Sequence, residues 1–300
     1  MKKIVLLLSV LLPVLAHAAS TINSTNKYAW GANFGWMDWR PSAADGVVIG
    51  EYVCSGYVYG ANVGWINLGN GAPTNHIQYS NTSATDFGLN YTIDPTMPGV
   101  AVLRGYAYGA NIGWINFENT GNPRLRFSNG HLEGYAYSAN CGWINLGDGS
   151  FTLSTDFIAP GVDSEPDGMA DAFEFLYLGG LAGNPNADND GDGMTNAQEY
   201  LEGTDPTLAG DRFQVISGII TAMSGTDTTT QLVWTSNLSR LYAIDTTLDL
   251  RDPNSWVDLA IDGAPNSIIP SIGPSTTRTV LTPNAPRRFF RARAIRPLIP

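Results

Sequence analysis

Acidic side chains at alternate positions of one short segment form a pattern that could hold a metal ion. Residues 188–199 read DNDGDGMTNAQE, with oxygen-bearing side chains at positions 1, 3, 5, 9 and 12 and glycine at position 6. A hard cation such as Ca²⁺ takes six to eight oxygen ligands at roughly 2.3–2.6 Å, and alternate side chains of a tight loop converge on one point. The spacing predicts a Ca²⁺ site with the ligands Asp188, Asp190, Asp192, the carbonyl of Met194, Asn196 and Glu199.

A second, looser copy of this pattern starts 25 residues earlier, since 188 − 163 = 25. Its third position holds glutamate, whose side chain is longer than the usual aspartate or asparagine, and this affects the affinity of the site for Ca²⁺. Mg²⁺ fits such loops less well because it prefers few protein ligands and retains water. Zn²⁺ is unsupported, because the only histidines after His17 lack metal-ligand spacing. The second set of Ca²⁺ ligands comprises Asp163, Glu165, Asp167, the carbonyl of Met169, Asp171 and Glu174.

The charge of the chain is concentrated in the same region. Lys+Arg 16 against Asp+Glu 27 gives a net charge of −11. Twelve of the acids and no basic residue lie between Asp163 and Asp211, so the rest of the chain carries 16 − 15 = +1. The alternative to a metal site is an acidic, solvated linker, but crowded carboxylates without basic neighbours repel each other unless a cation neutralises them. The lack of a basic stripe argues against nucleic-acid binding.

Short helices are expected after both loops. Phe173, Leu176 and Tyr177 have helical spacing, and Ala197, Tyr200 and Leu201 repeat it. We expect these two apolar faces to pack together over the metal sites.

The acidic block resembles the EF-hand-like, thrombospondin type 3-like and dockerin-like calcium segments of secreted bacterial proteins. The phrase DGDGMTNAQEYLEGTDP at 190–206 carries the resemblance. It implies that the matching carboxylates bind Ca²⁺ and stiffen a junction between β domains. A dockerin would also bind a cohesin, but the 14-residue Gly-rich stretch from Phe175 to Asp188 departs from the tight duplicated unit of that family.

Four copies of another phrase precede the acidic block. They read YAWGANFGWMD at 28–38, YVYGANVGWIN at 57–67, YAYGANIGWIN at 106–116 and YAYSANCGWIN at 135–145. The second Trp of each copy is Trp36, Trp65, Trp114 and Trp143, so the spacings are 29, 49 and 29. Near-identical units predict a repeat architecture, and alternating residues around a Gly/Asn turn predict a β-hairpin in each. Closure as a solenoid, propeller or barrel stays open.

The repeated aromatic residues have two interpretations. Trp65, Trp114 and Trp143, together with the tyrosines, could be platforms for sugar rings. Alternatively, the rings pack the repeat cores and Asn62, Asn111 and Asn140 satisfy the turns. We favour packing, because structural positions must recur in every repeat whereas binding positions can vary. Exposure of the three tryptophans in one line would favour sugar binding instead.

Two cysteines replace apolar residues of the repeat. Cys54 aligns with Leu103 and Leu132, and Cys141 stands where other copies have Phe34, Val63 and Ile112. Two buried thiols fit these positions. In a secreted chain a disulfide between Cys54 and Cys141 also fits.

The chain ends in a segment with the pattern of a small β-sandwich. Six or seven short apolar runs occur between Phe213 and Ile295, separated by Gly, Pro, Asn, Ser and Thr. The phrases RLYAIDTTLDLRDPNSW and RRFFRARA resemble immunoglobulin- or fibronectin-like end modules. We expect the Arg-rich last run to be a charged edge strand, and a patch for anionic polysaccharide is the alternative.

The N-terminus has the form of a secretory signal. Lys2 and Lys3 precede an apolar run at 4–16, and Ala16-His17-Ala18 predicts cleavage after Ala18. A membrane anchor, the alternative, needs about 20 apolar residues. No later segment is long enough to span, so we expect export to the cell exterior or surface without a transmembrane segment after cleavage.

These patterns predict a mainly β protein with four parts. They are a signal peptide (1–18), a β-repeat module (19–158), a calcium-binding segment with small helices (159–211) and a β-sandwich (212–300). We expect a secreted, calcium-binding, non-enzymatic structural or adhesion protein, with cell-surface polysaccharide or another surface protein as partner. Carbohydrate binding by the repeat aromatics is the alternative. A glycan-cleaving enzyme is the third, and needs two carboxylates facing one cleft, drawn from Asp38, Glu51, Glu118, Glu133 and Asp148.

Overall fold

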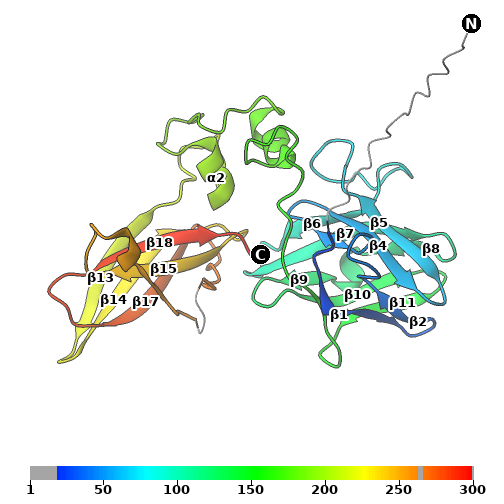
Figure 1. The fold of residues 1–300 in the computed structure, drawn as a ribbon, viewed down its shortest axis with the longest axis horizontal. Coiled ribbons are helices and arrows are strands. Elements are labelled where there is room, and N and C mark those ends of the chain that lie inside the picture. Colours follow the sequence, from blue (N-terminus) through cyan, green and yellow to red (C-terminus); the bar gives the residue numbers. More distant parts are fainter. Residues whose placement is uncertain (1–18, 263–265, 299–300) are drawn as a thin grey trace, which may run out of the picture.

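The protein is mainly β, as the sequence predicts, and its parts follow one another along the chain (Figure 1). The computed structural model describes residues 19–262 and 266–298. The predicted signal peptide, 1–18, lies outside these residues. Within them, no helix has the length and apolar character that crossing a membrane requires.

The four repeats form four antiparallel hairpins that close into a barrel. Each hairpin also pairs with the next, through β2–β4, β5–β7, β8–β10 and β11–β1, so the ring has no free edge. Closure as a barrel resolves the question that the repeat pattern leaves open. Within the described chain the hairpins are β1 (Ile22–Gly31) with β2 (Gly35–Asp38), β4 (Cys54–Gly60) with β5 (Gly64–Asn70), β7 (Val100–Gly109) with β8 (Gly113–Asn116), and β10 (His131–Ser138) with β11 (Gly142–Gly147).

Short strands extend the sheet at the base of the barrel. β6 (Leu89–Ile93), β9 (Arg124–Arg126) and β12 (Leu153–Thr155) pair with the first parts of β7, β10 and β1, and β3 (Val48–Ile49) pairs with β4. A 3₁₀ turn, η1 (Asn119–Gly121), precedes β9. β7 and β10 pass from the base into the barrel at Gly105 and Gly134, whose φ values are 114° and 85°. A Cβ at either position would clash with a backbone carbonyl, so the repeat requires glycine there.

Alternation along the strands sorts the side chains of the barrel. The inward positions hold small or aliphatic residues, which fill the interior as expected for an eight-stranded barrel. Phe34, Val63 and Ile112 are buried in the turns at one end. The aromatic residues of the repeats point outward instead and are partly exposed. The buried inward residues are Ala29, Met37, Val58, Ile66, Ala107, Ile115, Ala136 and Ile144.

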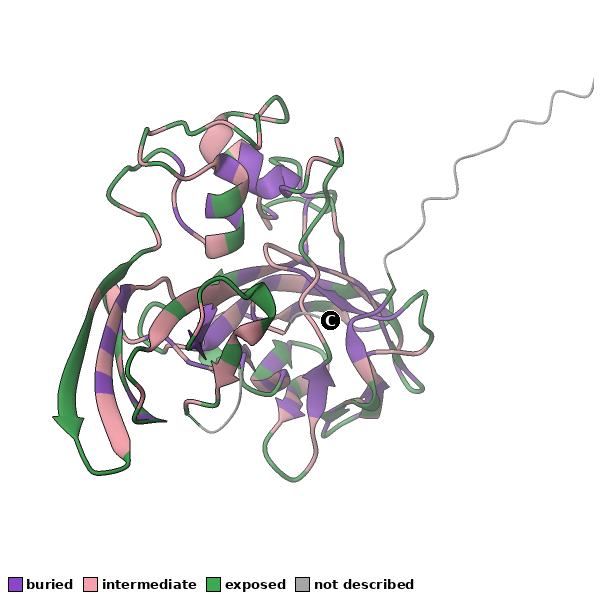
Figure 2. Ribbon diagram, turned by 60° about the vertical axis from the view of Figure 1, so that its left-hand side comes forward, coloured by how far each residue is buried: buried purple, intermediate pink, exposed green. Residues whose placement is uncertain are grey.

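Two antiparallel sheets form the predicted sandwich. One contains β13 (Val215–Met223), β14 (Asp227–Thr235) and β17 (Ser275–Pro283). The other contains β15 (Leu241–Thr247), β16 (Val257–Leu259) and β18 (Phe289–Ile295), and a 3₁₀ turn, η3 (Pro253–Ser255), precedes β16. Trp234, Tyr242, Ile244 and Val280 are buried between the sheets. Along the outer edge of the first sheet, β13 is exposed over almost its whole length (Figure 2).

The Arg-rich strand β18 is an edge strand, as predicted, and an acidic residue on the neighbouring strand neutralises part of its charge. Asp245 of β15 accepts hydrogen bonds from Arg291 Nε at 2.6 Å and from Arg293 Nε at 2.6 Å. Burial acts to raise the pKa of the Asp245 carboxyl, but the bonds from Arg293 and Arg291 outweigh it and hold that pKa below its ordinary value. The carboxylate form of Asp245 therefore stabilises the folded sandwich.

We expect Asp245→Asn to reduce the free energy of unfolding by about 2 kcal/mol at pH 7, the scale of hydrogen bonds to charged groups. Because the folded pKa of Asp245 is lowered, its contribution is fully present above the unfolded pKa of about 3.9 and is lost as the pH falls through the folded value. Urea unfolding of both proteins at pH 7, 5 and 3, at fixed Ca²⁺ concentration, measures this. A difference that persists undiminished at pH 3 would contradict the assignment.

Candidate metal centre

Both acidic loops lead into short helical turns between the barrel and the sandwich (Figure 1). The first loop precedes α1 (Asp171–Phe173) and a π-helical turn, η2 (Glu174–Leu178), and the second precedes α2 (Asn196–Glu202). Thr195 begins α2 with a capping box, in which its hydroxyl accepts from Gln198 N and its backbone N donates to the Gln198 side chain. The predicted helices are therefore present, the first of them very short.

The two helical turns pack on each other through aromatic rings. The centroids of Phe173 and Tyr200 are 5.0 Å apart, and those of Phe173 and Tyr177 are also 5.0 Å apart. Ala197 packs against the same cluster. Leu176 and Leu201 are exposed, so the predicted apolar contact holds for the rings but not for these two leucines.

The second loop brings its three aspartates together. One oxygen from each of Asp188, Asp190 and Asp192 lies within 4.8 Å of the other two. Asp188 organises the turn by accepting hydrogen bonds from the backbone N of Gly191 at 2.8 Å and of Gly193 at 2.9 Å. Gly193 has φ 100°, which only glycine adopts readily. Asp190 Oδ2 and Asp192 Oδ2 are buried without a hydrogen-bond partner among the described residues.

The remaining predicted ligands of this loop lie at the start of α2 or just before it. Asn196 donates from Nδ2 to Asn184 O at 2.9 Å, which leaves its Oδ1 buried and unpartnered in the described structure. Glu199 is fully buried, and burial together with Asp190 and Asp192 raises its pKa to about 7. The backbone N of Met194 donates to Asp192 Oδ1 at 2.8 Å, which holds this residue in the loop.

The first loop has the same character but a different arrangement. Glu165 belongs to two close acidic groups, one with Asp163 and Asp171 and one with Asp167 and Glu174. Its longer arm therefore still reaches the other carboxylates. Both oxygens of Glu165 and of Glu174 are buried without hydrogen-bond partners among the described residues. Burial and the neighbouring Glu165 raise the pKa of Glu174 to about 8.

Two further predicted ligands of the first loop have defined local roles. Asp171 accepts from Ser164 N and from Ser164 Oγ, each at 2.7 Å, so its carboxylate is held in place. Met169 is buried, and its backbone N donates to Asp167 Oδ1 at 2.9 Å. Carboxylate and amide oxygens that are buried and unpartnered are the donors a hard cation accepts. These acidic groups can therefore hold a metal ion.

Comparison of the chain with protein-family models, with curated proteins and with solved structures gives no match.

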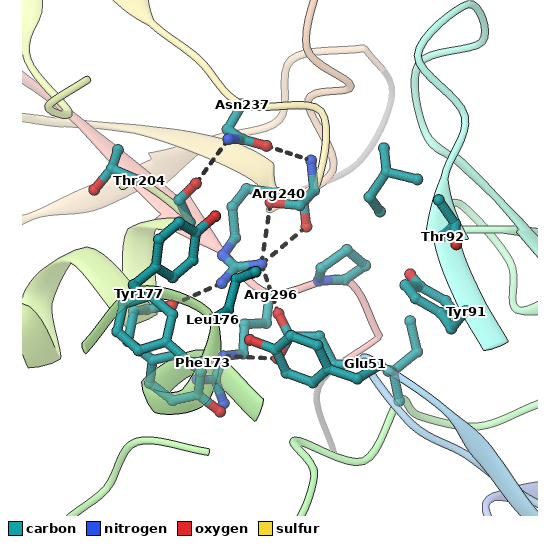
Figure 3. A pocket seen from close by; sticks show the side chains of 17 residues that line it. Glu51, Tyr91, Thr92, Phe173, Leu176, Tyr177, Thr204, Asn237, Arg240 and Arg296 are labelled. Atoms are coloured by element: carbon teal, nitrogen blue, oxygen red, sulfur yellow. Dashed lines mark hydrogen bonds and ion pairs between the residues drawn. The ribbon is translucent and has the colours of Figure 1, made fainter. Parts of the chain in front are cut away.

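A buried arginine joins the segment with the two acidic loops to both β modules (Figure 3). Arg240, from the loop before β15, donates from Nη2 to Tyr200 O at 2.7 Å and from Nε to Leu201 O at 2.8 Å. Its Nη1 donates to Glu51 Oε1 of the barrel at 2.8 Å. A cation at the last carbonyls of a helix also complements the helix dipole. Nothing local in the sequence signals Arg240 and Glu51, which are 189 residues apart.

Other contacts strengthen this junction around a cavity of about 270 Å³. The Arg296 guanidinium lies 4.1 Å from the centroid of the Tyr200 ring, and Arg296 Nε is 3.8 Å from Glu51 Oε2. Asn237 Nδ2 donates to Gly203 O at 2.7 Å, just beyond the end of α2. Both ends of α2 are thus held, the first by the acidic loop and the second by the sandwich.

The repeated tryptophans lie on the outside of the barrel. Trp36 and Trp65 are each 50% exposed, and Trp114 and Trp143 are each 44% exposed. The preferred interpretation, in which these rings pack the repeat cores, is therefore wrong. They follow the circumference of the closed barrel instead of one straight line. Each ring is flanked by aromatic residues of its own hairpin, as Trp114 is by Tyr106 and Tyr108.

The repeated asparagines have a structural role that differs from the predicted one. Each donates from its side chain to a backbone carbonyl of the neighbouring turn, so the bonds form a ring around one end of the barrel. The donor–acceptor pairs are Asn33 with Cys141 (2.9 Å), Asn62 with Phe34 (2.9 Å), Asn111 with Val63 (3.1 Å) and Asn140 with Ile112 (3.1 Å). These side chains therefore connect the turns to each other.

Cys54 and Cys141 are free thiols, and no disulfide joins them in the described structure. Cys54 begins β4, whose other end at Gly60 reaches the turns, whereas Cys141 lies in a turn. Six residues of strand span roughly 20 Å, far more than the Cα separation of up to about 7 Å that a disulfide allows. Cys54 is fully buried, which raises its pKa to about 12.

Two of the carboxylates considered for glycan cleavage share one surface cavity. Glu133 and Asp148 line a space of about 580 Å³ with Arg124 and His131. Burial acts to raise the pKa of Glu133, but Arg126 and Arg124 outweigh it and lower that pKa. Hydrogen bonds from Ser150 lower the pKa of Asp148. Neither group has the raised pKa that a general acid needs.

Proposed function

We propose that this chain is a secreted, calcium-binding, non-enzymatic structural or adhesion protein of the cell surface or extracellular matrix. In it, Ca²⁺ stiffens the junction between the barrel and the sandwich. The observation that carries the proposal is the set of buried, unpartnered carboxylate oxygens in two loops at that junction. The signal-like N-terminus supports export, and a cell-surface polysaccharide or another surface protein is the proposed partner.

The donor set favours Ca²⁺ over other metals. Both loops supply only oxygen ligands. In each loop the predicted ligands are numerous and lie on both sides of a turn, which suits Ca²⁺, because Ca²⁺ takes six to eight oxygens in a flexible geometry. Mg²⁺ would retain several waters and use few of these carboxylates. Burial and neighbouring carboxylates raise the pKa values of Glu174 and Glu199, and a bound cation would cancel the repulsion from those neighbours.

The position of α2 explains how a bound ion would act on the junction. Glu199 immediately precedes Tyr200, whose carbonyl accepts from Arg240 and whose ring lies under Arg296. An ion that orders Glu199 would therefore order the carbonyls to which the sandwich binds. The same arginine also pairs with Glu51 and so connects α2 to the barrel.

Isothermal titration of the mature chain with CaCl₂ tests the proposal. We expect two bound ions, and Asp190→Asn/Asp192→Asn should remove one of them while leaving the fold unchanged. The matched control is Asp227→Asn, which alters an aspartate of the sandwich outside both loops. Absence of binding heat at millimolar Ca²⁺ would refute the proposal, as would equal stoichiometry in the double variant.

Carbohydrate binding by the barrel is a second candidate function, favoured by the exposure of its tryptophans. Exposed, rigid aromatic rings offer an apolar surface to the C–H face of a sugar. A glycan array probed with the mature chain, with and without Ca²⁺, tests this candidate. Signal above that of a denatured control supports it, and a blank array in both conditions contradicts it.

A further inference from the structure

The spacing of the repeats is longer between Trp65 and Trp114 than elsewhere, because additional residues form a loop beside Trp114. Residues 80–87 of this loop are called the wall. Residues 71–88 connect β5 to β6, and their Phe87 ring meets the Trp114 ring edge-on, with centroids 5.0 Å apart. Between the wall and the barrel lies a cavity of about 390 Å³. Ligand pockets typically measure about 300–1,000 Å³. The cavity is lined by Asn81, Thr82, Ser83, Ala84, Phe87, Tyr106 and Trp114.

The wall is tied firmly to the barrel. Asn81 Oδ1 accepts from Gly88 N at 3.1 Å and from Tyr106 N of β7 at 3.3 Å. The buried Asp86 accepts from Ser80 N at 3.1 Å and from Thr74 N at 3.2 Å, which closes the loop on itself. A cavity whose walls are already ordered binds without the entropic cost of ordering them.

The lining selects one chemical class of ligand. Trp114, Phe87 and Tyr106 supply aromatic surface, and Thr82 and Ser83 supply hydroxyl groups. A hydroxyl that makes one internal hydrogen bond, as Thr82 does with Ser80, can still make another. No lining residue is charged. A neutral sugar ring matches this set, because it combines an apolar C–H face with hydroxyls along its edge and carries no charge.

We propose that the cavity between Trp114 and the loop 80–87 is a binding site for a neutral sugar residue of a glycan. This inference rests on the second candidate function and locates it at one of the four hairpins. Trp114 provides the stacking surface, and Thr82 and Ser83 contact the hydroxyls of the sugar. The site does not depend on the metal loops, so it is tested separately from them.

The test titrates the Ca²⁺-saturated mature chain with four separate probes: cellohexaose, mannohexaose, chitohexaose and polygalacturonate. We expect at least one of the neutral oligosaccharides to bind and the anionic polygalacturonate not to bind. Trp114→Ala should weaken that binding at least tenfold, in keeping with the loss of a central tryptophan. Thr82→Val, which removes only a hydroxyl, should weaken it severalfold and covers the case in which Trp114→Ala fails to fold.

Trp36→Ala is the matched control. Trp36 occupies the same repeat position, is similarly exposed and meets Phe151 edge-on at 5.2 Å, but it lacks the wall 80–87. We expect the affinity of Trp36→Ala for the bound oligosaccharide to stay within twofold of that of the original chain. Equal losses in Trp65→Ala, Trp143→Ala and Trp114→Ala would overturn this site while leaving carbohydrate binding by the barrel intact. Failure of every neutral glycan to bind the original chain would overturn both.

Discussion

Removal of Ca²⁺ from the mature chain with excess EDTA is expected to lower the melting temperature by about 5–10 °C per occupied site. An ion present at a hundredfold excess over its Kd stabilises the folded state by about 2.7 kcal/mol. For chains of about 150–250 residues, each kcal/mol shifts the melting temperature by roughly 2–4 °C. Differential scanning calorimetry with and without Ca²⁺ measures the shift. The physical basis is the repulsion among carboxylates such as Glu165 and Glu174, which a bound ion cancels.

Two controls separate this effect from general ionic strength. Mg²⁺ at the same concentration should restore much less of the melting temperature, because it takes few protein oxygens as ligands. The variant Asp190→Asn/Asp192→Asn should show a smaller Ca²⁺ response and a higher melting temperature in EDTA than the original chain, because it carries less unneutralised charge. Identical melting curves in Ca²⁺ and in EDTA would contradict the calcium assignment.

Arg240→Ala is expected to weaken Ca²⁺ binding at the loop 188–199 by about fivefold or more, the lower end of typical coupling between sites. Arg240 touches no predicted ligand, but it holds the carbonyls of Tyr200 and Leu201, directly after Glu199. Without it, the end of α2 loses two hydrogen bonds, and the ion must supply more of the ordering of this helix. Breaking a buried ion pair also costs about 3–5 kcal/mol, here the pair between Arg240 and Glu51. Calcium titration and small-angle scattering measure the two effects.

The scattering result distinguishes a junction from a local helix effect. We expect Arg240→Ala to have a larger radius of gyration than the original chain, even with Ca²⁺ bound, because the barrel and sandwich lose a shared contact. Arg251→Ala is the control, since Arg251 is exposed and pairs with Asp249 on the surface of the sandwich. Such exposed pairs contribute about 0–1 kcal/mol. Unchanged affinity and radius in Arg240→Ala would show that the metal loops and the junction are independent.

Some features of the site follow from local sequence. The aspartates of the loop 188–199 come together because alternate positions around Gly193 converge whatever the rest of the chain does. The hairpins of the repeat are equally local, since each turn joins two adjacent strands. The strands of the sandwich also lie within the predicted span from Phe213 to Ile295.

Other features depend on partners distant in sequence. Alternation separates Tyr59 and Trp65 from Val58 and Ile66, but it does not say which set faces the core. Closure of the ring between β11 and β1 decides this, because a narrow barrel has room inside only for small or aliphatic side chains. For this reason the aromatic rings lie outside, contrary to the sequence-based preference.

The sequence by itself determined the acidic loops, the repeated hairpins and the mainly β character of this protein, because each depends on neighbours a few residues apart. Only the tertiary structure decided the closure of the barrel, the wall beside Trp114 and the hydrogen bonds of Arg240 to Glu51 and to the end of α2. Those contacts join residues up to 189 positions apart. Such pairs leave no spacing pattern in a single sequence, and the folded chain alone brings them together.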